Sequence, residues 1–312
     1  MKLTPVTKLY AIAALSFFSF AFVATQQDFS KTEMKTTKVS GNISMLEGAG
    51  GNIGVSAGPD GVLIVDDQFA PLAEKIRAAL KAINPGALRF VLNTHWHGDH
   101  TGSNAIFGAE ATIIAHDNVR QRLMNDSERN GRVTKAAPQV AWPVITFSQT
   151  VSIHFNGEEI RLIHLPKGHT DGDSVIYFTG SKVAHLGDDF FAGRFPFVDL
   201  NSGGSVEGLT KNIAEVIALL PADVKIIPGH GPLGTLDDLK AYHQTIVETT
   251  EIVRAQMKAG KTLDQIKAAG LPENYKVWGS GFINTGAWLE TIYKSLGAEA
   301  KKPAMRVKPP TE

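Results

Sequence analysis

Short apolar runs along the chain alternate with longer stretches in which apolar positions recur every three or four residues. The short runs, bounded by glycine, proline or aspartate, predict β-strands at 51–57, 61–67, 89–94, 159–165, 175–178, 183–185 and 225–227. The three-to-four-residue spacing predicts α-helices over 71–83, 206–220, 236–258 and 282–296. Helices interspersed with strands indicate an α/β fold, with the helix over 206–220 packed on the sheet.

Residues with metal-binding side chains follow the strand predicted at 89–94. His95-Trp96-His97-Gly98-Asp99-His100 places three imidazoles and a carboxylate within six residues. Imidazole and carboxylate bind borderline divalent metals such as zinc. A loop leaving a strand can turn alternate side chains toward one point, so His95 and His97 would hold one metal and Asp99 and His100 a neighbour. A chance cluster on a solvated loop is the less favoured alternative, since the chain has ten histidines in 312 residues.

Three more predicted strands lead to residues of the same kind. His169 lies in the glycine-containing loop 166–174, Asp188 follows the strand at 183–185, and His230 follows the strand at 225–227. A metal site at one edge of a sheet requires ligands from several strand ends. The chain therefore has the residues for such a site.

The motifs His-x-His-x-Asp-His, Gly-His-Thr, Gly-Asp after a strand, and Pro-Gly-His-Gly occur here in that order. Together they resemble the metallo-β-lactamase superfamily of dinuclear metallohydrolases, from about Thr37 to the helix after His230. The resemblance implies a four-layer αβ/βα sandwich with the metals at one edge. The set of motifs is specific for the superfamily and much less specific for the substrate.

The resemblance also implies two Zn²⁺ ions per chain. The first would be held by His95, His97 and His169, the second by Asp99, His100 and His230, and Asp188 would bridge both. Iron and manganese stay open because similar nitrogen and oxygen ligand sets accept them. Two close metals can lower the pKa of shared water to about 7 and polarise a carbonyl. A metal-bound hydroxide is thus the expected nucleophile, oriented by Asp99, which would return a proton to the leaving group.

The expected reaction is hydrolysis of a small-molecule amide, lactam or ester bond, β-lactams included. Asp188 departs from the lactamase branch, where cysteine or serine is usual, and resembles the glyoxalase II, lactonase and phosphodiesterase branches. The stretch 142–204 is more similar to lactamase-like secreted hydrolases. A lactonase or a thioesterase of glyoxalase II type is the alternative, and an iron-dependent oxygenase on the same fold is an alternative of another class. A non-catalytic scaffold is disfavoured because every ligand position is filled.

Two residues outside the ligand set are predicted to contact substrate. Arg194 lies in an aromatic loop after Asp188, and a guanidinium can bind a substrate carboxylate in bidentate fashion; a surface arginine over packed phenylalanines is an equal alternative. Asn201 continues that loop. Thr170 and Asp173 either orient His169 or cap its loop. The remaining candidates are interpreted as structural or turn residues: Asp66, Asp67, His116, His154, His164, His185 and His243.

The first residues of the chain differ from the rest. Lys2 and Lys8 precede an uncharged apolar stretch that ends in small residues, so residues 1–24 are predicted to be a secretory signal peptide, cleaved near residues 21–25. This implies export to the periplasm or the medium; an uncleaved anchor is the alternative. Removal of the segment takes away two lysines and no acid, and the formal net charge falls from 0 to −2.

Composition and charge limit the class of protein and its partners. The chain has 43% hydrophobic and 20% charged residues, which is typical of a soluble globular protein. A near-neutral charge argues against a nucleic-acid partner, and the absence of cysteine excludes disulfides. We expect one hydrolase domain over 25–297 and a flexible lysine- and proline-rich tail over 298–312. The expected partner is a small-molecule substrate, with no stable membrane insertion after signal cleavage, and the oligomeric state stays open.

Overall fold

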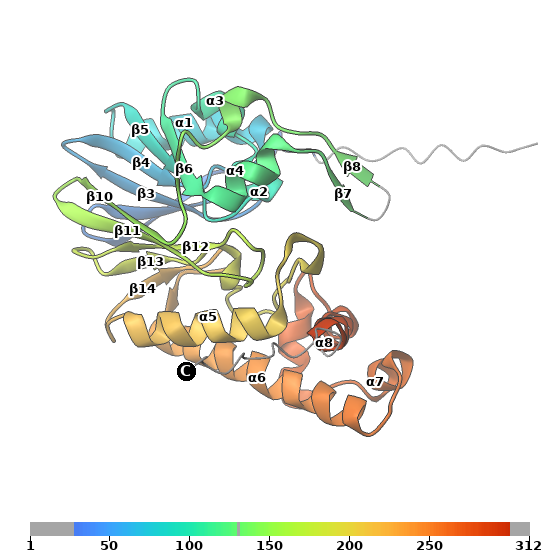
Figure 1. Ribbon diagram of the computed structural model, residues 1–312. Helices are drawn as coiled ribbons and strands as arrows, with labels where there is room; N and C mark the ends of the chain where they lie inside the picture. Colours follow the sequence, from blue (N-terminus) through green and yellow to red (C-terminus); the bar gives the residue numbers. More distant parts are fainter. Residues whose placement is uncertain (1–27, 130–131, 300–312) are drawn as a thin grey trace, which may run out of the picture. The chain divides into compact units, whose positions relative to one another are not determined.

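The computed structural model describes residues 28–129 and 132–299 (Figure 1). The predicted signal peptide at 1–24 lies outside the described residues, as does the predicted tail from residue 300 onward. All helices and strands belong to the compact unit that begins at Thr32. No helix among the described residues is both long enough and apolar enough to span a bilayer.

The first sheet has seven strands. In spatial order they are β1 (Lys35–Ser40), β2 (Ile43–Glu47), β3 (Ile53–Gly58), β4 (Gly61–Val65), β5 (Leu88–Leu92), β6 (Thr112–His116) and β9 (Ile145–Phe147). Strands β1 to β4 pair antiparallel, whereas β4, β5, β6 and β9 pair parallel. Because β4 and β5 run parallel, the chain leaves both strands at the same edge of the sheet.

The second sheet has six strands. In order they are β10 (Thr150–Phe155), β11 (Glu158–His164), β12 (Ser174–Phe178), β13 (Val183–His185), β14 (Lys225–Ile227) and β15 (Gly234–Thr235). Only β13 and β14 pair parallel, so the segments after these two strands leave the sheet side by side. A separate hairpin consists of β7 (Ser127–Arg129) and β8 (Arg132–Thr134).

Helices cover the sheets. They are α1 (Ala73–Ile83), α2 (Gly98–Thr101), α3 (Asn104–Phe107), α4 (Asp117–Met124), α5 (Val206–Leu219), α6 (Leu236–Lys258), α7 (Leu263–Ala269) and α8 (Thr285–Glu299). Five 3-10 turns complete the described residues: η1 (Ala70–Leu72), η2 (Gln139–Ala141), η3 (Gly187–Asp189), η4 (Leu200–Ser202) and η5 (Glu273–Ser280). In Figure 1, α5 and α6 lie beyond the second sheet, and α1 and α3 lie beyond the first.

Two apolar cores produce this layering. Ile43, Leu63, Ile160 and Phe178 belong to one core shared by both sheets. Neighbouring residues of the second sheet face the other way: Val175, Ala184 and Ile226 pack in a second core with α5, α6 and α8. Because successive side chains of a strand point to opposite faces, β12, β13 and β14 each contribute to both cores. The layer order is helix, sheet, sheet, helix, and the predicted α/β fold class is confirmed.

Most predicted elements are present with shifted ends. Strand β4 stops at Val65 because Asp66 and Gln68 adopt the left-handed backbone region, with φ of 63° and 54°. Helix α8 begins at Thr285 rather than at 282 and runs to Glu299, two residues beyond the predicted domain end. His116 ends β6 and caps the amino terminus of α4. The sequence patterns missed β1, β2, β6, β9, β10 and α7.

Candidate metal centre

The predicted ligand residues come from four strand ends. His95, His97, Asp99 and His100 follow β5, where His97 is the extended residue that precedes the short helix α2. His169 lies in the loop between β11 and β12, Asp188 in the turn η3 after β13, and His230 after β14. The structure brings all seven together as two groups that could each hold a metal ion.

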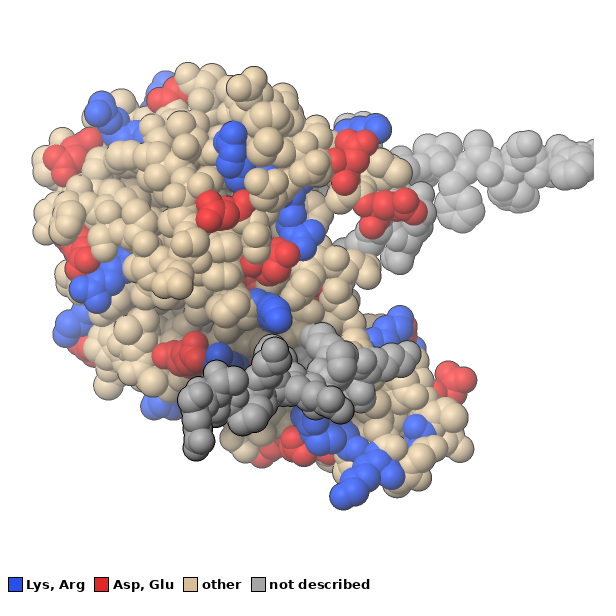
Figure 2. Space-filling view, viewed as in Figure 1, with Lys and Arg blue, Asp and Glu red and all other residues tan. Residues whose placement is uncertain are grey.

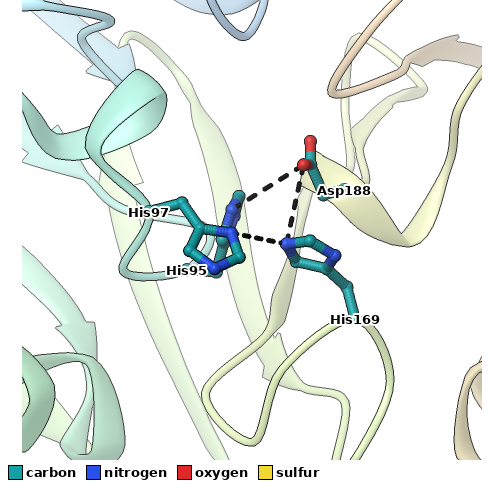
Figure 3. A group of neighbouring side chains, drawn as sticks. All are labelled: His95, His97, His169 and Asp188. Carbon is teal, nitrogen blue, oxygen red and sulfur yellow. Dashed lines mark hydrogen bonds and ion pairs between the residues drawn. The ribbon is translucent and has the colours of Figure 1, made fainter. Parts of the chain in front are cut away.

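The first group consists of His95, His97, His169 and Asp188, whose ligand atoms all lie within 4.8 Å of one another. Figure 3 shows their side chains pointing toward one another from separate segments. His97 Nδ1 lies 2.8 Å from His169 Nε2. Asp188 Oδ2 lies 3.5 Å from His169 Nε2 and 3.9 Å from His95 Nε2.

The second group consists of Asp99, His100 and His230. Asp99 Oδ2 lies 3.3 Å from His230 Nε2 and 3.7 Å from His100 Nε2. The other oxygen of Asp188, Oδ1, faces this group at 3.1 Å from His100 Nε2 and 3.3 Å from His230 Nε2. Asp188 therefore presents one oxygen to each group.

Two glycines allow the segments to approach Asp188 this closely. Gly187 has φ of 51°, and a Cβ atom there would lie 2.5 Å from Thr94 Oγ1. A Cβ atom on Gly229 would overlap Asp188 Oδ1. Glycine tolerates both the left-handed backbone and the missing side-chain space. The glycines of the Gly-Asp and Pro-Gly-His motifs are thus required by packing around the carboxylate.

The outward ring nitrogens of four imidazoles have hydrogen-bond partners. His169 Nδ1 donates to the Phe197 carbonyl at 2.7 Å, and His100 Nδ1 donates to Asp66 Oδ2 at 2.7 Å. His97 Nε2 donates to Asp199 Oδ2 at 3.0 Å. His95 Nδ1 lies 3.0 Å from Thr94 Oγ1, whose hydroxyl donates to Asp66. Carbonyl and carboxylate oxygens only accept, so these ring hydrogens point outward and the inward nitrogens of neutral rings carry lone pairs.

The inward atoms fit metal ions. His97 Nδ1 and His169 Nε2 face each other at 2.8 Å, and two lone pairs at that distance repel unless a cation lies beside them. His95 Nε2 is buried and makes no hydrogen bond among the described residues, and the buried atoms His100 Nε2 and Asp188 Oδ1, which lie 3.1 Å apart, face only other atoms of the ligand groups. Buried polar atoms without partners are costly. A nitrogen and oxygen donor set of this kind suits zinc and related divalent ions.

Electrostatics differ between the two groups. Burial lowers the pKa of His95 well below its usual range and that of His169 to about 4, so both rings are neutral at pH 7. Burial also opposes protonation of His100 and His230, but Asp188 and Asp99 outweigh it. They raise the pKa of His100 well above its usual range and that of His230 to about 9. The carboxylates of Asp99 and Asp188 thus favour positive charge among the ligand atoms of the second group.

Two carboxylates behind the ligands extend the site. Asp66 is fully buried and accepts from Thr94 N and Oγ1 as well as from His100. From the sequence, Asp66 was interpreted as a turn residue, and its left-handed φ of 63° at the end of β4 agrees with that role. In addition, its carboxylate holds the ring of His100. Asp199 was missed, because nothing near it in the sequence connects it with His97, 102 residues away. Both carboxylates fix the orientation of a ligand imidazole.

Other residues near the site have local roles. Thr170 N donates to Asp173 Oδ2 at 2.7 Å, which supports the loop-capping interpretation of this pair. Asp189 Oδ1 accepts from the backbone N of His169 at 3.2 Å. None of the five histidines interpreted as structural belongs to either group found among the described residues. Two of them, His116 and His164, stack on each other with ring centroids 3.6 Å apart.

A cavity of about 800 Å³ opens over both groups, beside His97 of the first and Asp99 and His230 of the second. Its lining residues are Phe69, His97, Gly98, Asp99, Asp188, Phe191, Arg194, Phe195, Phe197, His230 and Phe282. Arg194 is exposed and lines the cavity, as a substrate contact must. Asn201 is exposed in η4 and is absent from the lining, with its backbone N held by Asp199 Oδ1 at 3.2 Å. Asn201 is therefore not among the residues that line this cavity, and its contact with substrate stays a prediction.

Comparisons with known proteins agree with this arrangement. A family model described as the metallo-beta-lactamase superfamily matches residues 38–230. A hydroxyacylglutathione hydrolase from Nitrosococcus oceani is 27% identical over 164 residues, which is 51% of this chain and 55% of that protein. The chain spans about half the length of the hydroxyacylglutathione hydrolases it matches.

Solved structures share the fold. A metallo-beta-lactamase from Pontibacter korlensis aligns with a TM-score of 0.57 at 15% identity, covering 68% of this chain and 99% of that one. A stereoselective inverting sec-alkylsulfatase from Pseudomonas sp. aligns with a TM-score of 0.65 at 15% identity, covering 89% of this chain and 52% of that one. At these identities the likeness concerns the fold alone.

Proposed function

The chain belongs to the metallo-beta-lactamase superfamily, and we propose that it hydrolyses small molecules with an activated carbonyl, preferring thioesters and lactones to β-lactams. The family and the hydroxyacylglutathione hydrolase relatives support a metal-dependent hydrolase. The observation that carries the proposal is Asp188, which turns one carboxylate oxygen to each ligand group beside a cavity of about 800 Å³.

The proposed metals are two zinc ions. His95, His97 and His169 would hold one, and Asp99, His100 and His230 the other, with Asp188 shared. When bound, such a pair lowers the pKa of water and polarises the scissile carbonyl. The buried inward atoms of His95, His100 and Asp188, which have no hydrogen-bond partner outside the ligand groups among the described residues, support this assignment.

The protein's own groups would orient the reaction. Asp99 lines the cavity, and its side chain is 28% exposed against 5% for Asp188. It is therefore the carboxylate that substrate can reach, and we assign it the role of holding and returning the proton that the leaving group needs. Asp66 and Asp199 keep His100 and His97 in the tautomers that leave their inward nitrogens free.

Arg194 would bind an anionic group of the substrate. It lines the same cavity as Asp99, and no ion pair within residues 28–129 and 132–299 involves its guanidinium. An unpaired guanidinium at a cavity is well suited to a carboxylate, which it can bind through two parallel hydrogen bonds.

The leaving group decides between substrate classes. Opening a lactam leaves an anionic nitrogen that needs a positive site. Asp188 adds a negative charge between the two groups, so less positive charge is available for that nitrogen. The thiolate of a thioester and the alkoxide of a lactone are better leaving groups than the lactam nitrogen, and they depend less on a positive site. Relatives named hydroxyacylglutathione hydrolases support the thioester side of this proposal.

The setting is proposed to be outside the cytoplasm, because the composition of residues 1–24 is that of a signal peptide. Lysines and arginines are interspersed with aspartates and glutamates on the face shown in Figure 2, and the formal net charge is 0. Such a surface supports a small-molecule substrate over nucleic acid. Amino-terminal sequencing of the protein recovered from a cell fractionation tests export, and retention of residues 1–24 on cytoplasmic protein contradicts it.

The activity is tested on one zinc-loaded preparation with three substrates: a thioester, a lactone and a chromogenic cephalosporin. We expect kcat/KM to be higher for the thioester and the lactone than for the cephalosporin, with all three above the metal-free control. A cephalosporin turned over faster than both others contradicts the proposed preference. Absence of hydrolysis of all three contradicts the proposed function.

A further inference from the structure

The wall of the cavity is aromatic. Five phenylalanines line it: Phe69, Phe191, Phe195, Phe197 and Phe282. We infer that the substrate carries an aryl group besides its anion and its scissile carbonyl. This inference rests on the proposed function and names the substrate class that the site selects.

The inner phenylalanines are fixed in place. Phe191 stacks on the ring of His230 with centroids 5.1 Å apart, and Phe195 stacks on Trp288 of α8 at 5.6 Å. Phe197 contacts the His169 ring edge to face at 5.6 Å, and its carbonyl accepts from His169. The aromatic wall is therefore continuous with the ligand imidazoles, and an aryl group packed on it lies next to the reacting bond.

Phe282 is the outermost member. It is 85% exposed, yet its ring meets Phe197 edge to face with centroids 6.4 Å apart. An exposed phenylalanine at a cavity gains the most from a ligand that covers it, because burial of apolar surface is favourable. Aromatic rings add a preference for edge-to-face and offset contacts, which favours an aryl over an alkyl ligand.

Arg194 lies on the same wall of the cavity. The Arg194 stem packs against Gly281, where a Cβ atom would lie 2.8 Å from Arg194 Cδ. Gly281 precedes Phe282, so the guanidinium and the outermost ring belong to one corner of the cavity. An anion at Arg194 and a ring against Phe197 and Phe282 can thus be parts of one substrate. The geometry selects an aryl-bearing anion rather than a small polar acid.

The test is a series of thioesters made from one carboxylate-bearing thiol with acetyl, cyclohexylacetyl or phenylacetyl groups. We expect kcat/KM to rise roughly 10- to 100-fold from acetyl to phenylacetyl, with cyclohexylacetyl between them. Phe282→Ala should reduce the phenylacetyl advantage about 3- to 10-fold. Val277→Ala is the matched control, because Val277 is also exposed in this segment but does not line the cavity. It should leave the series unchanged.

Binding of the corresponding thioethers, which lack the carbonyl, separates this inference from the proposed function. Tighter binding of the phenethyl than the ethyl thioether without hydrolysis of any thioester supports the aryl site and contradicts the hydrolase. Equal hydrolysis of acetyl and phenylacetyl thioesters contradicts the aryl site and leaves the hydrolase standing. A cyclohexylacetyl rate above the phenylacetyl rate overturns the aryl preference.

An independent observation assigns a positioning role to Asn52, a buried residue just before β3. Its Nδ2 donates to the Pro228 carbonyl at 3.0 Å and to the Gly231 carbonyl at 2.9 Å. Its backbone N donates to the Gly229 carbonyl at 2.7 Å, and its carbonyl accepts from His185 Nε2 at 3.0 Å. We propose that Asn52 holds the segment around His230 and thereby sets the second ligand group.

The hydrogen bonds lie on both sides of His230. Residues 228 and 231 flank the ligand, so one amide group clamps both ends of its turn. The preceding residue, Gly51, packs on the other histidine of the group, since a Cβ atom there would overlap the His100 ring. A segment of the first sheet thus fixes a ligand carried by the second sheet, which no local pattern in the sequence indicates.

Asn52→Asp keeps the shape and removes both Nδ2 donors. We expect affinity for a second zinc ion to fall about 10- to 100-fold, with the first ion retained, in a titration against a metal-binding dye. Asn52→Ser is the second variant, should the aspartate prevent folding. Asn156→Asp is the matched control: Asn156 is also buried and donates to Ser56 Oγ and the Gly61 carbonyl, away from the site. Two-metal binding unchanged in both Asn52 variants, or lost equally in the control, contradicts the assignment.

Discussion

The two ligand groups differ in their access to solvent. In the first group, the side chains of His95 and His169 are 1% and 0% exposed. In the second group, Asp99 and His230 are 28% and 24% exposed and line the cavity. The second group is therefore more open to solvent than the first, although His97 of the first group also lines the cavity and His100 of the second group is buried. We propose that an ion in the first group would have mainly a holding role and that an ion in the second would meet the substrate.

The groups also differ in charge. In the first, burial keeps the imidazoles of His95 and His169 neutral, Asp188 is the carboxylate ligand, and Asp199 lies behind His97. The second combines Asp99 with the other oxygen of Asp188, and Asp66 lies behind His100. An acidic, open site binds cations through charge but exchanges them with solvent more readily. We therefore expect the second ion to leave before the first.

Removal of one ligand from each group is expected to have the largest effect on metal binding. His169→Ala should lose both ions and reduce kcat/KM at least about 100-fold, because the enclosed ion positions the shared Asp188. His230→Ala should keep one ion and lose the second. Elemental analysis and hydrolysis rates of both variants check this. Equal metal loss in the two variants would show that the groups are not distinct.

Asp188→Asn tests the residue that the two groups share. Asparagine keeps the shape but removes the negative charge and one of the two anionic oxygens. We expect affinity for the second ion to fall at least about 10- to 100-fold and the first ion to be affected less. The measurement is zinc content after dialysis at a series of free zinc concentrations. Full metal content and activity would contradict the shared position and direct attention to Asp189.

A smaller effect is expected from the carboxylates behind the ligands. Asp66→Asn and Asp199→Asn each weaken the hydrogen bond that orients an imidazole, His100 in one group and His97 in the other. About a 10-fold loss of affinity is expected, in the second group for Asp66 and in the first for Asp199. Zinc titration of both variants separates the groups, and a loss confined to the same ion in each variant would contradict the assignment.

The smallest expected effect concerns Arg194. Arg194→Ala should raise KM for carboxylate-bearing substrates roughly 3- to 10-fold and leave kcat nearly unchanged, since an exposed ion pair contributes to binding of substrate and transition state alike. A neutral analogue of the substrate provides the control. If KM for this analogue rose equally, Arg194 would act by packing on Gly281 rather than by charge.

The sequence was informative where ligands lie close together along the chain. His95 to His100 occupy one loop after one strand, so their spacing alone predicted a metal site. His169, Asp188 and His230 are far apart, and the order of motifs placed them together. Partnerships that cross between sheets were not predictable in this way. Asp199 with His97 and Asn52 with the His230 segment depend on how two sheets face each other, and no spacing rule encodes that.

Element ends and edge strands were likewise beyond the patterns. Strand β1, at the edge of the first sheet, carries polar residues at all positions but one, so it has no apolar alternation. Asn201 shows that proximity in sequence to Arg194 does not by itself place a residue at the cavity. Its backbone is tied to Asp199, whose carboxylate caps the turn η4.

We propose that one chain holds two ions of unequal accessibility. Stepwise removal by a chelator, followed by metal analysis and hydrolysis rate on the same samples, tests it most directly. We predict two metals per chain at the start, loss of the second ion and of activity in an early phase, and loss of the first ion later. Fully active protein with at most one metal per chain, all ligand residues being intact, would contradict the account.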